Sequence, residues 1–88
     1  MMKNHRMFVA KYLGPTNTKG TRIKIMDCRF KNKSVTYSWD YELGYLTTQA
    51  QAIFDLCNIK ITGYSEPWNE DNKTYFFTED FSTELISS

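Results

Sequence analysis

The sequence predicts a single α+β domain: a small, mainly antiparallel five-stranded sheet with one packed helix, in the order β-β-β-α-β-β. Three observations predict it. Apolar residues alternate with polar ones in several short segments, which is typical of strands. Short turns separate the first three segments, as in an antiparallel meander. One later segment has apolar residues at helical spacing. A partly open barrel is the alternative topology.

Residues 6–13 are predicted to form a central strand. Their alternate positions make two apolar sets, Phe8, Ala10 and Tyr12 on one face and Met7, Val9 and Leu13 on the other. A strand that is apolar on both faces is typically covered on both sides. A turn at 14–20 follows, in which Gly14 and Gly20 permit positive φ and Asn17 is able to bond its own backbone.

Residues 21–28 and 34–39 are predicted as the next two strands, joined by a polar turn at 31–33. The side chains expected to face the core are Ile23, Ile25, Val35, Tyr37 and Trp39. Arg22 and Lys24 alternate with the first two of these and therefore project from the opposite face.

One helix is predicted at about 49–58. Its apolar residues recur at i, i+3, i+4 and i+7 and are Ala50, Ile53, Phe54 and Cys57. Thr48 and Gln51 match the capping-box pattern with which many helices begin. A helix this short is not stable alone, so we expect it to lie on the sheet.

The C-terminal third is expected to add two strands, 59–64 and 73–78, on either side of an acidic loop at 65–72. The acidic tail 79–88 is expected either to add a helical turn or to fray. Residues 1–5 and 82–88 are the segments in which we expect flexibility.

Composition excludes several classes of protein. The chain has 88 residues, of which 41% are hydrophobic and 24% charged, so one folded domain is expected rather than a disordered chain. No apolar run reaches the ~18 residues of a membrane-spanning helix, and the N-terminus lacks a signal-peptide pattern. Cys28 and Cys57 are isolated, which predicts free thiols in a reducing, cytoplasmic environment.

No residue pattern predicts catalysis, a metal site or a cofactor. His5 is the only histidine and lies in the N-terminal segment, and both thiols fall on predicted core faces. The acidic loop 65–72 lacks the glycine and the final glutamate of a calcium loop. Asp40 and Glu42 lie two residues apart at a strand end, where we expect them to face water. The sequence therefore predicts a binding protein and not an enzyme.

Charge is divided along the chain. The first 33 residues contain nine Lys/Arg and one acid, a net +8 (9 − 1), whereas the last 55 contain two Lys/Arg and nine acids, a net −7 (2 − 9). The overall +1 therefore hides two oppositely charged parts. Such asymmetry indicates a binding surface of either sign, or the pairing of a basic strand with acidic C-terminal strands inside one sheet.

The basic part contains a candidate surface for nucleic acid. Its cations on the first hairpin and the next turn are Lys11, Lys19, Arg22, Lys24, Arg29, Lys31 and Lys33. Aromatic residues beside such cations stack on bases while the cations neutralise phosphates. Tyr12, Phe30 and Trp68 are the candidates for stacking.

The acidic part contains a candidate surface for protein. Its carboxylates are Asp40, Glu42, Asp55, Glu66, Glu70, Asp71, Glu79, Asp80 and Glu84. They either face the basic groove of a nucleic-acid enzyme or simply solvate one side of the domain. Trp68, in the loop with Glu66, Glu70 and Asp71, is the expected anchor of such an interface, unless it folds back over the core.

Residues 12–24, YLGPTNTKGTRIK, resemble the segment (F/Y)LGPTNxxGxRI(K) of a family of small, mostly uncharacterised proteins of phages, plasmids and bacterial genomes. Residues 37–41, YSWDY, resemble a second, looser block of that family. In relatives the helix start often carries Asn-His, where this chain has Thr48 and Gln49. The resemblance implies an accessory protein of a mobile element in a bacterial host. The GPTNTKG turn is either a structural hairpin or a recognition loop.

We expect a small non-enzymatic phage or mobile-element accessory protein that binds a host or defence-system protein. The specific hypothesis is an inhibitor of a host defence nuclease, of the anti-CRISPR or anti-restriction type. The alternative is a nucleic-acid-binding module that uses the basic first hairpin. Exposed strand edges in so small a sheet also leave a homodimer open.

Overall fold

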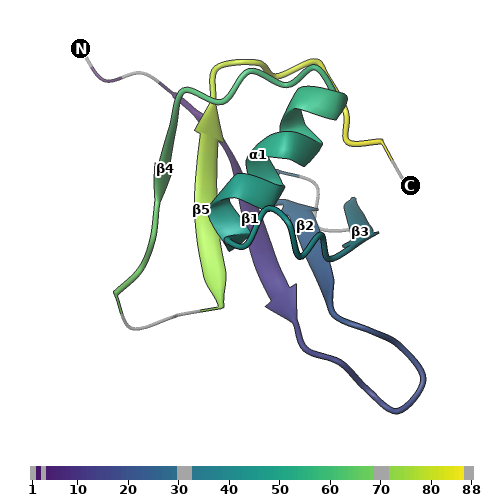
Figure 1. Cartoon of the computed structure of the whole chain (residues 1–88). Coiled ribbons are helices and arrows are strands. Elements are labelled where there is room, and N and C mark those ends of the chain that lie inside the picture. The colour runs from purple at the N-terminus through teal and green to yellow at the C-terminus, as the bar shows by residue number, and fades with distance from the viewer. Residues whose placement is uncertain (1, 3, 30–32, 69–71, 87–88) are drawn as a thin grey trace.

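Five strands form one antiparallel sheet in the order β3-β2-β1-β5-β4, and one helix packs on a single face of it (Figure 1). The computed structural model describes residues 2, 4–29, 33–68 and 72–86. The elements are β1 Arg6–Leu13, β2 Arg22–Asp27, β3 Ser34–Ser38, α1 Leu46–Leu56, β4 Gly63–Ser65 and β5 Lys73–Thr78. The predicted α+β class and element order are confirmed, and the sheet is open and not a barrel.

Strand β1 lies at the centre of the sheet, as its two apolar faces predict. It pairs with β2 on one side and with β5 on the other, so the C-terminal strand lies beside the N-terminal one. Side chains that stand directly opposite across a pair share one face. Phe8, which stands opposite Phe76, therefore marks the face that α1 covers, and Val9 marks the other face.

The core lies between α1 and the covered face. Its buried apolar residues are Phe8, Ala10, Ile23, Ile25, Val35, Ala50, Ile53, Phe54, Cys57, Ile59 and Phe76. The ring of Phe54 is the contact between the layers, because its centroid lies 5.1 Å from those of both Phe8 and Phe76. The predicted helix face, Ala50 to Cys57, is confirmed as the buried one.

The helix begins earlier than its sequence pattern predicts. Tyr45 is the N-cap residue and makes no side-chain cap bond, so the capping box assigned to Thr48 and Gln51 is wrong. The reason is a tertiary contact: the Gln49 side chain accepts from the Asp40 backbone N–H (2.9 Å) and donates to the Asp40 carbonyl (3.0 Å). This pair of bonds ties the connector to the first turn of α1.

The end of α1 follows a Schellman pattern. Asn58 has a φ of 60°, in the left-handed region that asparagine tolerates. Its N–H donates to the Asp55 carbonyl, and the Ile59 N–H donates to the Phe54 carbonyl. The predicted strand at 59–64 is therefore wrong for most of its length, because Ile59 caps the helix and enters the core. Backbone pairing with β5 begins only at Thr62, whose N–H donates to the Phe77 carbonyl, although the Lys60 carbonyl already accepts from the Thr78 hydroxyl.

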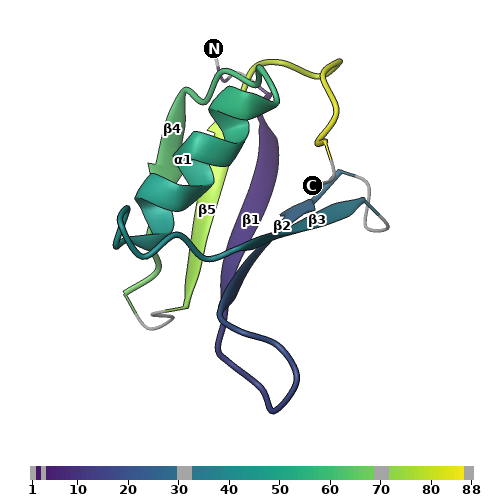
Figure 2. The same ribbon diagram turned by 45° about the vertical axis from the view of Figure 1, so that its right-hand side comes forward.

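The tail 79–86 lies over one end of the covered face and contains no helix or strand, so the expected helical turn does not form there (Figures 1 and 2). Arg6 donates to the carbonyls of Asp80 (3.2 Å) and Thr83 (2.6 Å). Further along, Leu85 packs against the core, and the Tyr37 hydroxyl donates to the Ile86 carbonyl.

Candidate functional site

One face of the sheet is left open. Figures 1 and 2 show α1 and the tail on the opposite side, and no other described segment crosses this face. By strand register, the residues that project from it are Met7, Val9, Lys11, Leu13, Arg22, Lys24, Met26, Ser34, Thr36, Ser38, Gly63, Ser65, Lys73, Tyr75 and Phe77. We call this surface the open face.

Three lysines stand side by side across the open face. Lys11 lies directly opposite Lys24 of β2 and directly opposite Lys73 of β5. Like charges directly opposite each other destabilise a sheet. This lysine row is therefore an arrangement that stability alone does not favour.

No carboxylate on the sheet offsets the lysine row. The only acid in the five strands is Asp27, and it faces the core. Strands β4 and β5 carry no acid, so the predicted pairing of a basic strand with acidic C-terminal strands does not occur. Among the described residues, no ion pair involves Lys11 or Lys24.

Apolar and aromatic side chains continue the open face beyond the lysine row. Val9 lies between Tyr75 and Met26 in the next row, about 7 Å away along the strands, and Met7 stands opposite Phe77 one row further on. Tyr75 and Phe77 are half-buried. The open face thus has a cationic end and an aromatic end.

The predicted basic residues do not form one patch. Arg22 and Lys24 lie on the open face, whereas Lys19 is exposed at the tip of the first hairpin. At the other end of the strands, Arg29 donates to the Phe81 carbonyl (2.8 Å) and Lys33 lies 3.7 Å from Glu84. Lys31 and Phe30 lie outside the described residues.

Sequence analysis missed Lys73, Tyr75 and Phe77. The alternation within 73–78 places these three on one face of a strand, but it does not say that β5 pairs with β1. Of the aromatic candidates, Tyr12 is on the covered face, where it makes an edge-to-face contact with Trp39 at 5.1 Å. Trp68 lies in the loop after β4 and lines a hollow beside the start of α1.

The hairpin turn is held differently from the prediction. Neither Gly14 nor Gly20 has a positive φ; among the described glycines only Gly44 does. The Thr16 hydroxyl, and not Asn17, bonds the turn by accepting from the Lys19 N–H (3.1 Å), while the Thr16 N–H donates to the Lys19 carbonyl (2.7 Å).

The acidic candidates gather on the helix side. Asp40 and Glu42 form a turn, in which the Asp40 carboxylate accepts from the Glu42 N–H (2.9 Å), and they are not a pair of facing carboxylates. Glu66 accepts from the Thr47 hydroxyl (2.6 Å) in the first turn of α1, where a negative charge is favourable. Trp68 is 92% exposed, so it does not fold back over the core. Glu70 and Asp71 lie outside the described residues.

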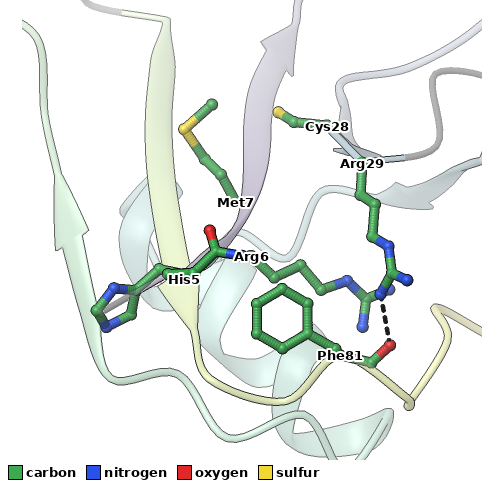
Figure 3. A pocket seen from close by; sticks show the side chains of 7 residues that line it. His5, Arg6, Met7, Cys28, Arg29 and Phe81 are labelled. Carbon is green, nitrogen blue, oxygen red and sulfur yellow. Dashed lines mark hydrogen bonds between the residues drawn. The ribbon is translucent and has the colours of Figure 1, made fainter. Parts of the chain in front are cut away.

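One hollow, of about 420 Å³, brings His5 and Cys28 to the same end of the sheet (Figure 3). Figure 3 shows His5 at one edge of it and Cys28 at the other. Burial, followed by the Asp27 charge, raises the pKa of the Cys28 thiol, which disfavours the reactive thiolate. Both thiols were predicted to face the core. Cys57 is buried there, but Cys28 is only half-buried and lies outside the core.

The remaining buried charges hold the fold together. Arg6 and Asp27 form an ion pair of 2.6 Å whose side chains are almost fully buried, and the guanidinium lies 4.7 Å from the Phe8 ring centroid. Within the described part of the chain, no three His, Cys, Asp or Glu side chains are grouped to hold a metal ion. Nor does any described helix have the length and apolarity needed to cross a membrane.

Comparisons with protein-family models, curated proteins and solved structures find no match to this chain. Its function must therefore be inferred from the open face of the sheet and from the exposed residues on the helix side.

Proposed function

We propose that this chain is a non-enzymatic binding protein that holds single-stranded nucleic acid on its open face. The observation that carries the proposal is the lysine row, Lys11 between Lys24 and Lys73, beside the half-buried aromatics Tyr75 and Phe77. The sequence-based alternative used the whole basic first hairpin and the turn after it; the present proposal keeps its Arg22 and Lys24 and centres the site on the open face of the sheet.

The chemistry of the two ends of the open face fits the two parts of a nucleotide. Ammonium groups neutralise phosphates, and the release of counterions makes such binding salt-dependent. Aromatic rings on a sheet stack on bases, provided that the bases are unpaired. Because stacking on aromatic side chains of a sheet requires bases that are not stacked within a duplex, single strands are favoured.

Fluorescence anisotropy with a labelled oligonucleotide of about 15 nucleotides, near the upper site size of single-strand-binding folds, tests the proposal. We expect binding at about 50 mM salt that weakens steeply as salt rises. The double variant Lys11→Glu/Lys24→Glu should lose at least tenfold in affinity. Lys60→Glu, which reverses an exposed lysine between α1 and β4, should bind almost as the wild type does. No binding, or equal losses in both variants, would contradict the proposal.

A second candidate function is the one that the sequence resemblance suggests. The chain would be a phage or mobile-element accessory protein that binds a host defence protein and inhibits it, as anti-CRISPR and anti-restriction proteins do. The exposure of Trp68 favours this candidate, because a loop tryptophan among carboxylates is a typical anchor of protein interfaces. Co-elution with a defence nuclease complex that is lost in Trp68→Ala supports it; a nuclease that neither binds nor loses activity counts against it.

A further inference from the structure

Three hollows meet around the exposed side of α1. The first, of about 190 Å³, shares Leu43 and Ala52 with the second, of about 460 Å³, and the second shares Thr47 with the third, of about 480 Å³. Because neighbouring hollows share lining residues, they lie next to one another along α1, and we call the three together the trough. Most of its lining residues belong to α1 and the loops beside it, on the side of the sheet where Figure 2 shows α1, but Lys73 of the open face also lines the third hollow.

Each hollow of the trough contains a large exposed apolar side chain. Leu56 lines the first hollow and Tyr64 the second, while Tyr45 and Trp68 line the third. All four side chains are more than half exposed. Single exposed apolar residues are ordinary, but a contiguous set of them is typical of an interaction surface.

Each hollow also contains one carboxylate: Asp40 in the first, Asp55 in the second and Glu66 in the third. Hydrogen bonds orient all three, and the Asp55 carboxylate accepts from Gln51 at 3.0 Å. No Lys or Arg occurs at 34–59, and Lys73, in the third hollow, is the only cation that lines the trough among the described residues. The first two hollows are therefore acidic, and the trough as a whole has three carboxylates against one cation.

We propose that the trough docks a basic segment of a partner protein, with Lys or Arg side chains facing the three carboxylates and apolar side chains between them. Because carboxylates outnumber cations in the trough, a positively charged partner would be complementary to it. Carboxylates and apolar side chains both occur in each hollow, and this arrangement fits an extended or helical segment. The inference rests on the second candidate function, protein binding, and is independent of nucleic acid on the open face.

Selection from a displayed library of random peptides of about 12 residues tests the chemistry without a known partner. Selected peptides should carry net positive charge and at least one large apolar residue. Trp68→Ala and Asp55→Lys should each weaken their binding at least tenfold. Glu84→Lys, which reverses an exposed carboxylate of the tail, should leave it within twofold. Circular dichroism of each variant separates loss of the trough from loss of the fold.

Three results would overturn the inference: no enrichment of any peptide, enriched peptides without positive charge, or binding that Glu84→Lys lowers as much as Asp55→Lys does. If a second copy of the chain occupies the trough instead, sedimentation will show a dimer that Asp55→Lys dissociates. If a nuclease binds the chain and the Trp68→Ala and Asp55→Lys variants bind it equally well, the second candidate function is supported, but the trough is not its binding site.

Discussion

The open face and the trough, which meet at Lys73, differ in how their charges are held. On the open face, Lys11 has a like charge directly opposite on each neighbouring strand, and no carboxylate of the sheet offsets it. In the trough, the carboxylates lie in separate hollows, and each accepts a hydrogen bond. The open face thus places like charges directly opposite one another, whereas the trough keeps its carboxylates apart.

A net charge of +1 therefore conceals one cationic surface, the open face, and one mainly acidic surface, the trough. The strands supply the cations, since alternation sends every second residue to the open face. The helix and its connecting loops supply the carboxylates, which collect on the covered side. Part of the charge split along the chain therefore becomes a difference between the two layers of the fold: Lys11, Arg22 and Lys24 lie on the open face, whereas Asp40, Asp55 and Glu66 line the trough.

The largest expected effect concerns Asp27, the one strand acid that belongs to neither surface. Asp27→Asn leaves the buried guanidinium of Arg6 without its counter-charge, and we expect a loss of about 3–5 kcal/mol in unfolding free energy. Urea denaturation measures it, with Asp55→Asn, at an exposed trough position, as the matched control. The double variant Arg6→Met/Asp27→Leu should recover much of the loss. A cost below about 1 kcal/mol for Asp27→Asn would show that the pair is not structural.

The next largest effect is a difference in oligonucleotide affinity between variants of two tyrosines, Tyr64 of β4 and Tyr75 of β5. Tyr75 projects from the open face and Tyr64 from the covered side, beside Phe76. We expect Tyr75→Ala to weaken oligonucleotide binding by about 1–3 kcal/mol, the contribution of one stacked base. Tyr64→Ala should leave oligonucleotide affinity unchanged and weaken the selected trough peptides. Equal effects of the two variants in the anisotropy assay would mean that the faces do not act separately.

A smaller effect is expected from relieving the lysine row. Lys11→Thr removes both like-charge contacts and introduces a residue with higher strand propensity, so the protein should become more stable by about 0.2–1 kcal/mol. The same change should lower the salt dependence of oligonucleotide binding by about 0.7 in slope, one phosphate contact. Lys60→Thr is the control for both measurements. If Lys11→Thr destabilises the fold, the row is not strained.

The smallest effect involves a carboxylate outside both surfaces. The Thr83 hydroxyl (2.5 Å), together with the N–H groups of Ser82 and Thr83, holds the pKa of Asp80 well below its usual range. A lowered folded-state pKa stabilises the protein above about pH 4, and this contribution is lost as the pH falls toward the folded value. Asp80→Asn should therefore lower the melting temperature at neutral pH.

The difference between wild type and Asp80→Asn should narrow as the pH drops below about 4. Glu84→Gln, at an exposed position nearby, serves as the comparison and should change little at any pH. A difference between Asp80→Asn and wild type that stays constant down to acid pH would contradict the assignment of this shift to the hydrogen bonds of the ionised carboxylate.

Local sequence patterns predicted most of the strands and the helix, but not which residues of different elements contact one another. Alternation located β1 and β5, and helical spacing located the buried face of α1. The helix start was missed because the Gln49 side chain bonds a backbone nine positions away, which outweighs the local capping pattern of Thr48. The lysine row was missed because Lys11 and Lys73 meet only through the pairing of β1 with β5. Such long-range register leaves no local signal in one sequence.

We expect nucleic acid to occupy the open face and to leave the hollows along α1 free. NMR titration of the isotope-labelled protein with a single-stranded oligonucleotide tests this expectation most directly. We predict that amide shifts will concentrate in β1, β2 and β5, at Lys11, Lys24 and Tyr75, while those of Ala52 and Asp55 on the exposed side of α1 stay in place. Shifts centred on α1 and the Trp68 loop, or no shifts at low salt, would contradict this expectation.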